Sequence, residues 1–356
     1  MKCSLRVVAV FLVCLWASPM FAQSIPQLAY ESVPNLLKMP DDIYLGEVLG
    51  VATNSKGHIF VYTRTGSDNV TTGTNRVFVR SGSRLFEFDQ NGKYVREIGQ
   101  GLYAFVQAHA VRVDPQDNIW IVDEGANMVV KFDPEGRVLM TMGRKPEAVN
   151  NPVRPAAVPP AGDAGFPGDS FNGPSDVAWD AAGDIFVADG SAPSRVAKFD
   201  KNGVFMKSWG GRGEAPGQFS TPHSIVVDAR DNVYVADRGN RRIQVFDRNG
   251  NLKTQYTNIG SPWALCITSG PHPYLYSSDS NGNDFDNATI YKMELDGTIL
   301  GKFGAGGKQL KEFGTVHEID CRKDNEVFVA EITNWRIQKL ILRADKVEST
   351  RTGATK

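Results

Sequence analysis

The chain has 356 residues, of which 41% are hydrophobic and 22% are charged, with 35 glycines and 19 prolines. This composition is typical of a globular protein and excludes a disordered, collagen-like or coiled-coil chain. The 39 lysines and arginines nearly balance the 40 aspartates and glutamates, giving a net charge of −1. That balance argues against a nucleic-acid partner and against binding to a membrane surface.

Residues 1–22 have the features of a secretory signal peptide. Lys2 and Arg6 precede the apolar run 7–16, and cleavage is expected ahead of Gln23. The apolar run is too short to anchor the chain in a bilayer. We therefore expect an exported protein, secreted or periplasmic, without a membrane anchor.

Export would place the remaining cysteines in an oxidising compartment. Cys3 and Cys14 leave with the signal peptide, so only Cys266 and Cys321 stay in the mature chain. These two can form a disulfide, or they can be two buried thiols that never meet. The sequence leaves both alternatives open.

A repeated pattern organises the rest of the chain. In its three clearest copies, a first Asp lies five residues after a shared position, here termed the slot, and a second Asp follows nine residues later. A strand rich in Arg, Val, Ile and Phe then leads into an Asp-x-x-Gly turn. Six copies are found, at residues 49–64 continued by 84–99, 109–138, 175–205, 223–252, 263–279 and 317–331.

Each copy consists of short alternating strands separated by turns of Asp, Asn and Gly. A single four-stranded sheet cannot bury both faces alone, so radial stacking of six such sheets is the economical arrangement. We therefore predict an all-β fold, a six-bladed β-propeller over residues 23–345, followed by a polar tail, 346–356. Because the sixth copy runs out of strands near Arg343, residues 25–34 are expected to supply its outer strand.

Three of the five histidines occupy the slot: His109, His223 and His317, in the second, fourth and sixth copies. Alternate blades of a six-fold ring are related by about a third of a turn, so three side chains at one height converge on the axis. Three imidazoles with an open fourth position suit a catalytic Zn²⁺ ion. The alternative is three unrelated turn histidines that cap strands.

The position directly after the second Asp of the repeat is also informative. It holds Arg64 in the first copy and Arg238 in the fourth, whereas Glu124, Gly190 and Ile332 stand there in the second, third and sixth copies. Two guanidinium groups at the same loop face of the propeller would bind a carboxylate or an oxyanion. Their alternative role is a salt bridge between neighbouring blades.

The stretch 235–250, VADRGNRRIQVFDRNG, resembles the NHL repeat. More specifically, the chain is similar to the peptidyl-α-hydroxyglycine α-amidating lyase family over about residues 45–342. The most specific matches are residues 219–246, 108–123 and 316–320, with a shorter match at 63–66. The resemblance implies a six-bladed NHL-type propeller with a catalytic zinc ion at its axis.

The resemblance also implies roles for individual residues. The three slot histidines become the zinc ligands, and Arg64 and Arg238 hold the substrate. The family has an Asp after the last of these histidines that helps to bind a structural calcium ion, and Glu318 occupies that position here. The implied reaction splits a carbinolamide into an amide and glyoxylate: zinc polarises the hydroxyl group and a base removes its proton.

One residue departs from the family pattern. The family's base is a Tyr that follows the Asp-Gly of the third blade, but this sequence has Ser191 there, and serine has no suitable pKa. Tyr103, in the loop before His109, is the best replacement base by position. Without a replacement base, the site would support a different metal-assisted reaction, or it would keep a metal for stability or ligand binding without turnover.

We therefore predict a zinc-dependent, lyase-like enzyme that acts on a small carboxylate-bearing or peptide-like substrate. The alternative is a non-catalytic propeller that binds a protein, peptide or glycan through its loop face. Two segments that interrupt the repeat would then carry specificity, the Ser/Thr/Gly/Asn-rich loop 65–83 and the Pro/Ala/Gly-rich loop 144–173.

Overall fold

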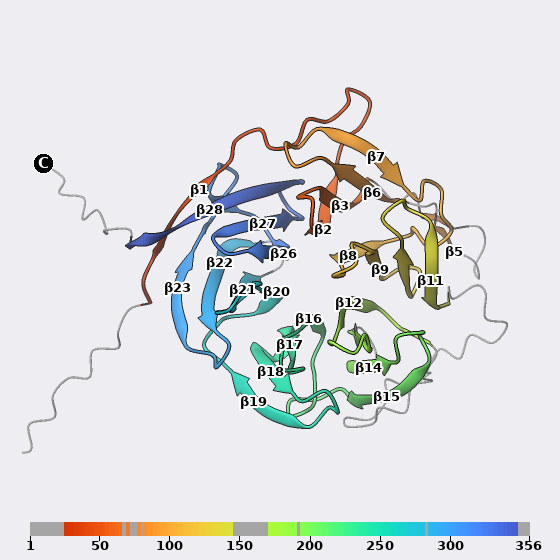
Figure 1. The fold of residues 1–356 in the computed structure, drawn as a ribbon, viewed down its shortest axis with the longest axis vertical. Helices are drawn as coiled ribbons and strands as arrows, with labels where there is room; N and C mark the ends of the chain where they lie inside the picture. Colours follow the sequence, from red (N-terminus) through yellow and green to blue (C-terminus); the bar gives the residue numbers. More distant parts are fainter. Residues whose placement is uncertain are drawn as a thin grey trace, which may run out of the picture.

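The computed structural model describes residues 25–65, 69–71, 77–79, 82–144, 170–190, 193–281 and 284–347. In this part of the chain, six four-stranded antiparallel sheets surround a central axis as blades (Figure 1). The predicted six-bladed β-propeller is thereby confirmed. The predicted signal peptide, Ser191, most of loops 65–83 and 144–173, and the end of the predicted tail lie outside the described residues.

The first three blades follow the chain from the axis outward (Figure 1). Blade 1 contains β2 (Glu47–Thr53), β3 (Ile59–Arg64), β6 (Ser83–Phe88) and β7 (Tyr94–Ile98). Blade 2 contains β8 (Ala108–Val113), β9 (Ile119–Asp123), β10 (Met128–Phe132) and β11 (Val138–Gly143). Blade 3 contains β12 (Pro174–Trp179), β13 (Ile185–Asp189), β14 (Arg195–Phe199) and β15 (Phe205–Gly210).

Blades 4 and 5 repeat this order, and blade 6 contains both ends of the described chain. Blade 4 contains β16 (Pro222–Val227), β17 (Val233–Asp237), β18 (Arg242–Phe246) and β19 (Leu252–Tyr256). Blade 5 contains β20 (Pro262–Ile267), β21 (Tyr274–Asn281), β22 (Asp284–Glu294) and β23 (Ile299–Phe303). Blade 6 contains β26 (Val316–Lys323), β27 (Glu326–Glu331), β28 (Arg336–Val347) and β1 (Leu28–Ser32). Two short sheets, β4 (Asn69–Thr71) with β5 (Val77–Val79) and β24 (Ala305–Gly306) with β25 (Glu312–Phe313), lie outside the blades.

The ring closes through β1, which pairs antiparallel with β28 as the outer strand of blade 6. Figure 1 shows β1 beside β28 at the rim. The predicted supply of the missing strand by residues 25–34 is therefore confirmed. β28 also runs to Val347, two residues into the predicted tail, because Val347 pairs with Leu28.

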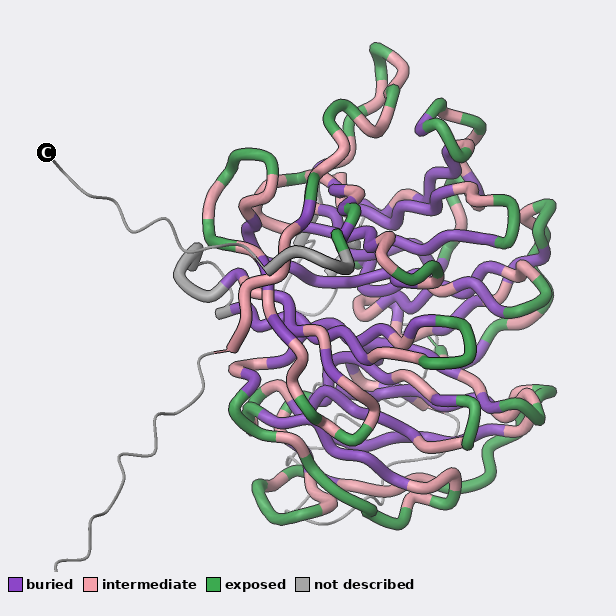
Figure 2. The backbone as a smooth tube through the Cα atoms, turned by 60° about the vertical axis from the view of Figure 1, so that its left-hand side comes forward, coloured by how far each residue is buried: buried purple, intermediate pink, exposed green. Residues whose placement is uncertain are grey.

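The hydrophobic core consists of six clusters, and each cluster joins two adjacent blades. The cluster between blades 1 and 2, for example, packs Phe60 and Tyr62 against Phe105 and Phe132. In Figure 2 the strands are largely buried and the connecting turns are exposed. Because each blade buries both of its faces against its neighbours, the whole ring is needed for a complete core.

The first aspartate of the repeat builds the turn between the two innermost strands. In blade 2, an oxygen of Asp114 accepts hydrogen bonds from the backbone N–H groups of Gln116 (3.0 Å) and Asn118 (2.9 Å). Asp180 and Asp228 form the same pair of hydrogen bonds in blades 3 and 4. These side-chain hydrogen bonds add to the backbone hydrogen bonds of the same turns, so the repeated aspartates have a structural role.

A disulfide links Cys266 in β20 to Cys321 in β26, with the two Cα atoms 5.9 Å apart. This settles the choice that the sequence left open between a disulfide and two separate thiols. The bond joins the innermost strands of blades 5 and 6. No helix in the described part of the chain has the length and apolar character needed to cross a bilayer.

Candidate metal centre

Each slot residue is the second or third residue of the innermost strand of its blade, and it lies at a β-bulge. The strand register shifts next to all six slot positions: Leu49, His109, Ser175, His223, Trp263 and His317. A bulge redirects a side chain out of the regular alternation of a strand. The repeat thus turns one residue of every blade toward the axis.

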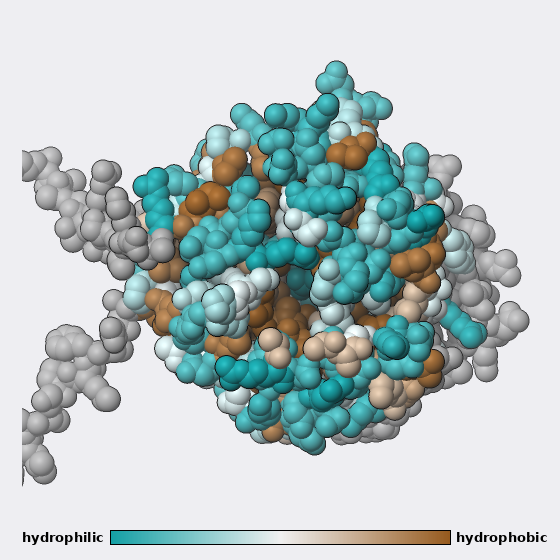
Figure 3. Space-filling model, viewed as in Figure 1, coloured by the Kyte–Doolittle hydropathy of each residue, from teal (hydrophilic) through white to brown (hydrophobic). Residues whose placement is uncertain are grey.

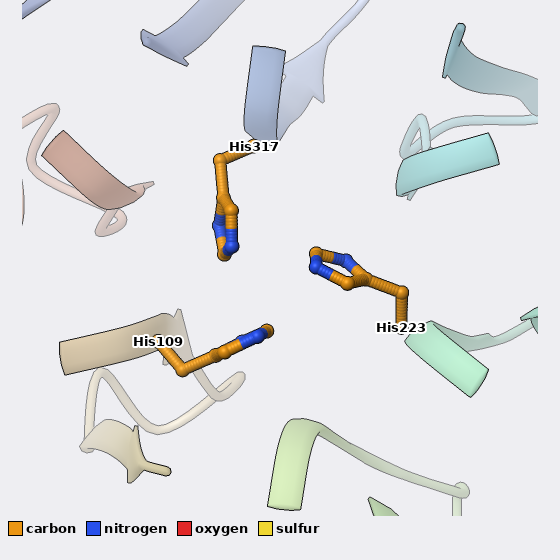
Figure 4. Close-up of side chains that lie close together, drawn as sticks. All are labelled: His109, His223 and His317. Atoms are coloured by element: carbon orange, nitrogen blue, oxygen red, sulfur yellow. The ribbon is translucent and has the colours of Figure 1, made fainter. Parts of the chain in front are cut away.

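The three slot histidines converge as predicted. Their ring centroids form a nearly equilateral triangle, with separations of 4.8 Å between His109 and His223, 4.6 Å between His109 and His317, and 4.7 Å between His223 and His317. One nitrogen of each ring lies within 4.8 Å of the corresponding nitrogens of the other two, and all three residues are buried. Figure 4 shows the three imidazoles directed from three strands toward a common centre.

Two of the rings are oriented by the slot residue of the next blade. His223 Nδ1 lies 2.8 Å from the carbonyl oxygen of Trp263, and His317 Nδ1 lies 2.8 Å from that of Leu49. A carbonyl oxygen only accepts, so both Nδ1 atoms carry the proton and both Nε2 atoms keep a lone pair. His109 differs. Its buried Nδ1 makes no hydrogen bond of regular geometry to the described residues. The backbone of Ser175 nevertheless lies close enough to this ring to raise its pKa.

The pKa values of all three histidines are lowered, and burial is the largest cause. His109 lowers the pKa of His223 further, and His109 and His223 both lower that of His317. For His109, Glu124 raises the pKa and Arg64 lowers it. The rings are therefore neutral at neutral pH. Three neutral imidazoles, two of them oriented through Nδ1, form a donor set that fits a zinc ion.

Arg64 and Arg238 both lie beside the histidine cluster. Arg64, the last residue of β3, donates a hydrogen bond from Nε to the carbonyl oxygen of Ala108 (3.0 Å). Arg238 begins the short 3-10 helix η2 (Arg238–Asn240), and its guanidinium lies over the Trp263 ring, 3.8 Å from its centroid. Burial lowers the pKa of Arg238. Arg64 also lies 3.7 Å from carboxylate oxygens of Glu47 and of Glu124 in the neighbouring blade. Its alternative role, a salt bridge between blades, is therefore present in the structure.

Two further residues at this site were not among the predicted site residues. Glu124 lies 3.7 Å from a guanidinium nitrogen of Arg64 and acts electrostatically on both Arg238 and His109. Trp263 packs against His223, with ring centroids 4.8 Å apart. Glu124 shares its repeat position with Arg64 and Arg238, and Trp263 is a slot residue, so both could have been found from the repeat.

Tyr103, the expected replacement base, and Glu318, the expected calcium ligand, lie in different surroundings. Tyr103 lies in the loop between β7 and β8, and 58% of it is exposed. Glu318 is buried in β26, where Oε2 accepts hydrogen bonds from the backbone N–H groups of Val51 and Val111, both 3.1 Å long.

The space around the axis divides into two parts. A small void lies directly beside the three histidines and is also lined by Asp176 and Glu318. A larger cavity of about 360 Å³ lies at the other ends of the innermost strands, where Trp179 and Arg322 contribute to its wall. Figure 3 shows the molecular face hollowed near its centre. Arg112 lines both spaces.

Comparison with known proteins places this site in context. Residues 219–246 match the family model of the NHL repeat. The chain is 28% identical to the probable peptidyl-alpha-hydroxyglycine alpha-amidating lyase of Caenorhabditis elegans, over 84% of this chain and 83% of that protein. It is 32% identical to the peptidylglycine alpha-amidating monooxygenase of Rattus norvegicus, over 86% of this chain but only 32% of that longer protein.

Solved structures support the same fold. A crystal structure of virginiamycin B lyase from Staphylococcus aureus superposes with a TM-score of 0.54, covering 89% of this chain and all of that chain at 12% identity. At this identity the likeness establishes the fold alone. The chain is thus an NHL-repeat six-bladed β-propeller. Among such propellers, it resembles the peptidyl-α-hydroxyglycine α-amidating lyases over most of its length.

Proposed function

We propose that this protein is an exported, zinc-dependent lyase of the peptidyl-α-hydroxyglycine α-amidating type. The observation that carries the proposal is the triangle of buried, neutral histidines flanked by Arg64 and Arg238. The relative from Caenorhabditis elegans, a probable peptidyl-alpha-hydroxyglycine alpha-amidating lyase by name, supports the same activity. The substrate class is a peptide or small molecule that ends in a carboxylate next to a hydroxylated carbon.

His109, His223 and His317 would hold the zinc ion, each through one ring nitrogen. A zinc ion bound there would supply Lewis-acid polarisation of the substrate hydroxyl group. Arg64 and Arg238 bind and orient the substrate carboxylate, since guanidinium groups pair well with carboxylates. In the reaction the hydroxyl proton is removed, a C=O bond forms, the C–N bond breaks, and the nitrogen leaves with its electron pair and takes up a proton.

Glu124 is the residue that we assign to proton removal. Its carboxylate lies 3.7 Å from Arg64 and acts electrostatically on His109, whereas Tyr103 is largely exposed in a loop. A carboxylate within reach of the substrate hydroxyl can act as a general base where the usual tyrosine is replaced by serine. Tyr103 remains the alternative base, and conservative substitutions described in the Discussion separate the two residues.

Glyoxylate release tests the proposed activity. The mature protein, loaded with zinc, is incubated with a short N-acylated peptide that ends in α-hydroxyglycine, and glyoxylate and the peptide amide are measured. We expect both products in equal amounts from the wild-type protein and from His272→Ala, which removes an exposed histidine. We expect neither above the uncatalysed rate from His223→Ala. Full zinc occupancy without product would instead favour a propeller that binds ligands without turnover.

Export has a separate test. The N-terminal segment 1–22 supports removal by a signal peptidase ahead of Gln23. The mass of the protein recovered from the exported fraction should correspond to a chain beginning at Gln23. Recovery of the full-length chain inside the cell would contradict this part of the proposal.

A further inference from the structure

Arg112 extends into the propeller axis just below the histidine cluster. It is the third residue after His109 in β8, and its side chain is 13% exposed. Its guanidinium forms a bidentate pair with Asp176, with Nε to Oδ1 at 2.9 Å and Nη2 to Oδ2 at 2.6 Å. Arg112 Nε also lies 3.1 Å from Glu318 Oε1. One cation thus lies between two buried carboxylates.

This cation is fixed by contacts to further innermost strands. Arg112 donates toward Ser224 Oγ at 3.2 Å and, over a longer distance of 3.4 Å, toward the carbonyl oxygens of Leu265 and Ile319. These contacts reach β16, β20 and β26. Although burial opposes the charge, Asp176 and Glu318 raise the pKa of Arg112, so its guanidinium stays protonated.

The two carboxylates complete the network. Asp176 Oδ2 accepts hydrogen bonds from Ser224 Oγ (2.7 Å) and from the backbone N–H of Ile225 (3.0 Å). Glu318 Oε2 accepts from the backbone N–H groups of Val51 and Val111. Burial raises the pKa of Glu318, whereas Arg112 and these two donors favour its ionised form. Together with Arg112, the carboxylates connect all six innermost strands.

A calcium ion does not fit this arrangement. Calcium requires six to eight oxygen ligands directed at one point. Here Glu318 Oε2 accepts hydrogen bonds from two backbone N–H groups, and Oε1 contacts the Arg112 guanidinium at 3.1 Å without a regular hydrogen bond. That guanidinium occupies the space between Glu318 and Asp176, where a calcium ion would have to lie. Gly50 shows how closely the strands approach, since a Cβ atom there would lie 2.8 Å from both Glu318 Oε2 and the Val111 nitrogen.

We propose that Arg112 is a built-in cation that takes the structural role for which the resemblance predicts calcium, and that it positions the zinc-binding histidines. The positioning follows from the chain. Glu318 is adjacent to His317, Ser224 is adjacent to His223, and Val111 is two residues from His109. Each histidine strand is therefore tied to the Arg112 network directly beside its ligand.

The first test uses the unaltered protein. Thermal unfolding of the mature, zinc-loaded chain is followed once in millimolar calcium and once in a calcium-selective chelator. Calcium binding to the same protein is measured by equilibrium dialysis. We expect no bound calcium and a Tm that is the same in both conditions. Stoichiometric calcium, or a difference in Tm of more than about 2 °C between the two conditions, would overturn the proposal.

The second test removes the cation. Arg112→Met keeps much of the side-chain volume but leaves two buried carboxylates without a counter-ion. We expect a lower Tm, at least 10-fold weaker zinc binding in a chelator competition, and a Tm that now rises when calcium is added. Arg137→Met, which removes an exposed arginine, should change none of these.

The proposal predicts a definite outcome for both the Arg112→Met variant and the wild-type chain. Unchanged Tm and zinc affinity in Arg112→Met would overturn it, and if this variant does not fold, the calcium measurements on the wild-type chain still decide. The proposal concerns metal content and stability, so it is independent of the proposed lyase activity. A protein without glyoxylate release could still have this network, and its readouts would not change.

Discussion

The Nδ1 atom of His223 donates a hydrogen bond to the carbonyl oxygen of Trp263, 2.8 Å away. His317 has the same relationship to Leu49. Two slot residues of blades that lack histidine, Trp263 and Leu49, thus orient a histidine of a neighbouring blade. For these two histidines, one blade provides the ligand and the next provides the carbonyl group that fixes its tautomer.

Stability of the metal-free protein should depend on pH through these histidines. Their pKa values in the folded protein are lowered, mainly by burial, below the value of about 6.5 expected in the unfolded chain. Below about pH 6.5 the unfolded state binds more protons than the folded state. The free energy of unfolding is therefore highest above that pH and decreases as the pH falls.

The free energy of unfolding should decrease by at most about 1.4 kcal/mol for each histidine and each pH unit. Urea unfolding of the metal-free protein between pH 5 and pH 8 measures it. A variant with His109, His223 and His317 all replaced by Asn should show a shallower dependence over the same range. Equal slopes for the two proteins would show that the histidines are not responsible.

Arg238→Ala should weaken recognition of the substrate carboxylate. Loss of a hydrogen bond to a charged group corresponds to about a 10- to 100-fold decrease in kcat/KM. The decrease should disappear with a substrate whose carboxylate is converted to an amide. Arg241→Ala, three residues away at an exposed position, is the matched control. An equal effect on both substrates would assign Arg238 a structural role.

Glu124 and Tyr103 can be distinguished by conservative substitutions. Removal of a general base reduces turnover by about 10²- to 10⁴-fold, so Glu124→Gln should lower kcat by that amount with zinc content unchanged. Tyr103→Phe should leave kcat close to the wild-type value. The opposite result, with Tyr103→Phe inactive and Glu124→Gln active, would assign the base to Tyr103.

The disulfide should stabilise the ring without contributing to the metal centre. The bond closes a loop of 55 residues between Cys266 and Cys321. Replacing both cysteines by serine should lower the free energy of unfolding by about 2–4 kcal/mol. Zinc content should stay the same, because neither sulfur is among the converging ligands. Loss of zinc in the double variant would show that the disulfide also shapes the site.

The fold and the histidine triad could be predicted because the repeat has a fixed spacing. The aspartates that build the turns, such as Asp114 and Asp228, mark blades 2, 3 and 4, and alignment of the other copies to these then places the slot histidines at one height. The bulge that turns each slot residue toward the axis is a backbone feature without a sequence signal of its own. Pairing of Cys266 with Cys321 depends on which blades are adjacent at the ring closure, and spacing alone does not give their orientation.

The Arg112 network was missed, although a signal for it exists. Three residues after the slot, the other copies carry Ala52, Ala178, Val226, Cys266 and Asp320, so Arg112 is the one basic residue at this position. One residue after the slot, Asp176 and Glu318 replace residues that are otherwise small. A cation and two carboxylates at inward-facing positions predict an ionic centre, because buried charges require partners.

Metal content measured by elemental analysis tests the central claim most directly. The protein is purified from the exported fraction without added chelator, alongside His223→Ala and the exposed-site control His272→Ala. We expect about one zinc ion per chain in the wild type and in His272→Ala, and almost none in His223→Ala, because two imidazoles alone hold zinc weakly. A folded wild-type protein without zinc, or undiminished zinc in His223→Ala, would contradict the assignment of the axial histidines as a metal centre.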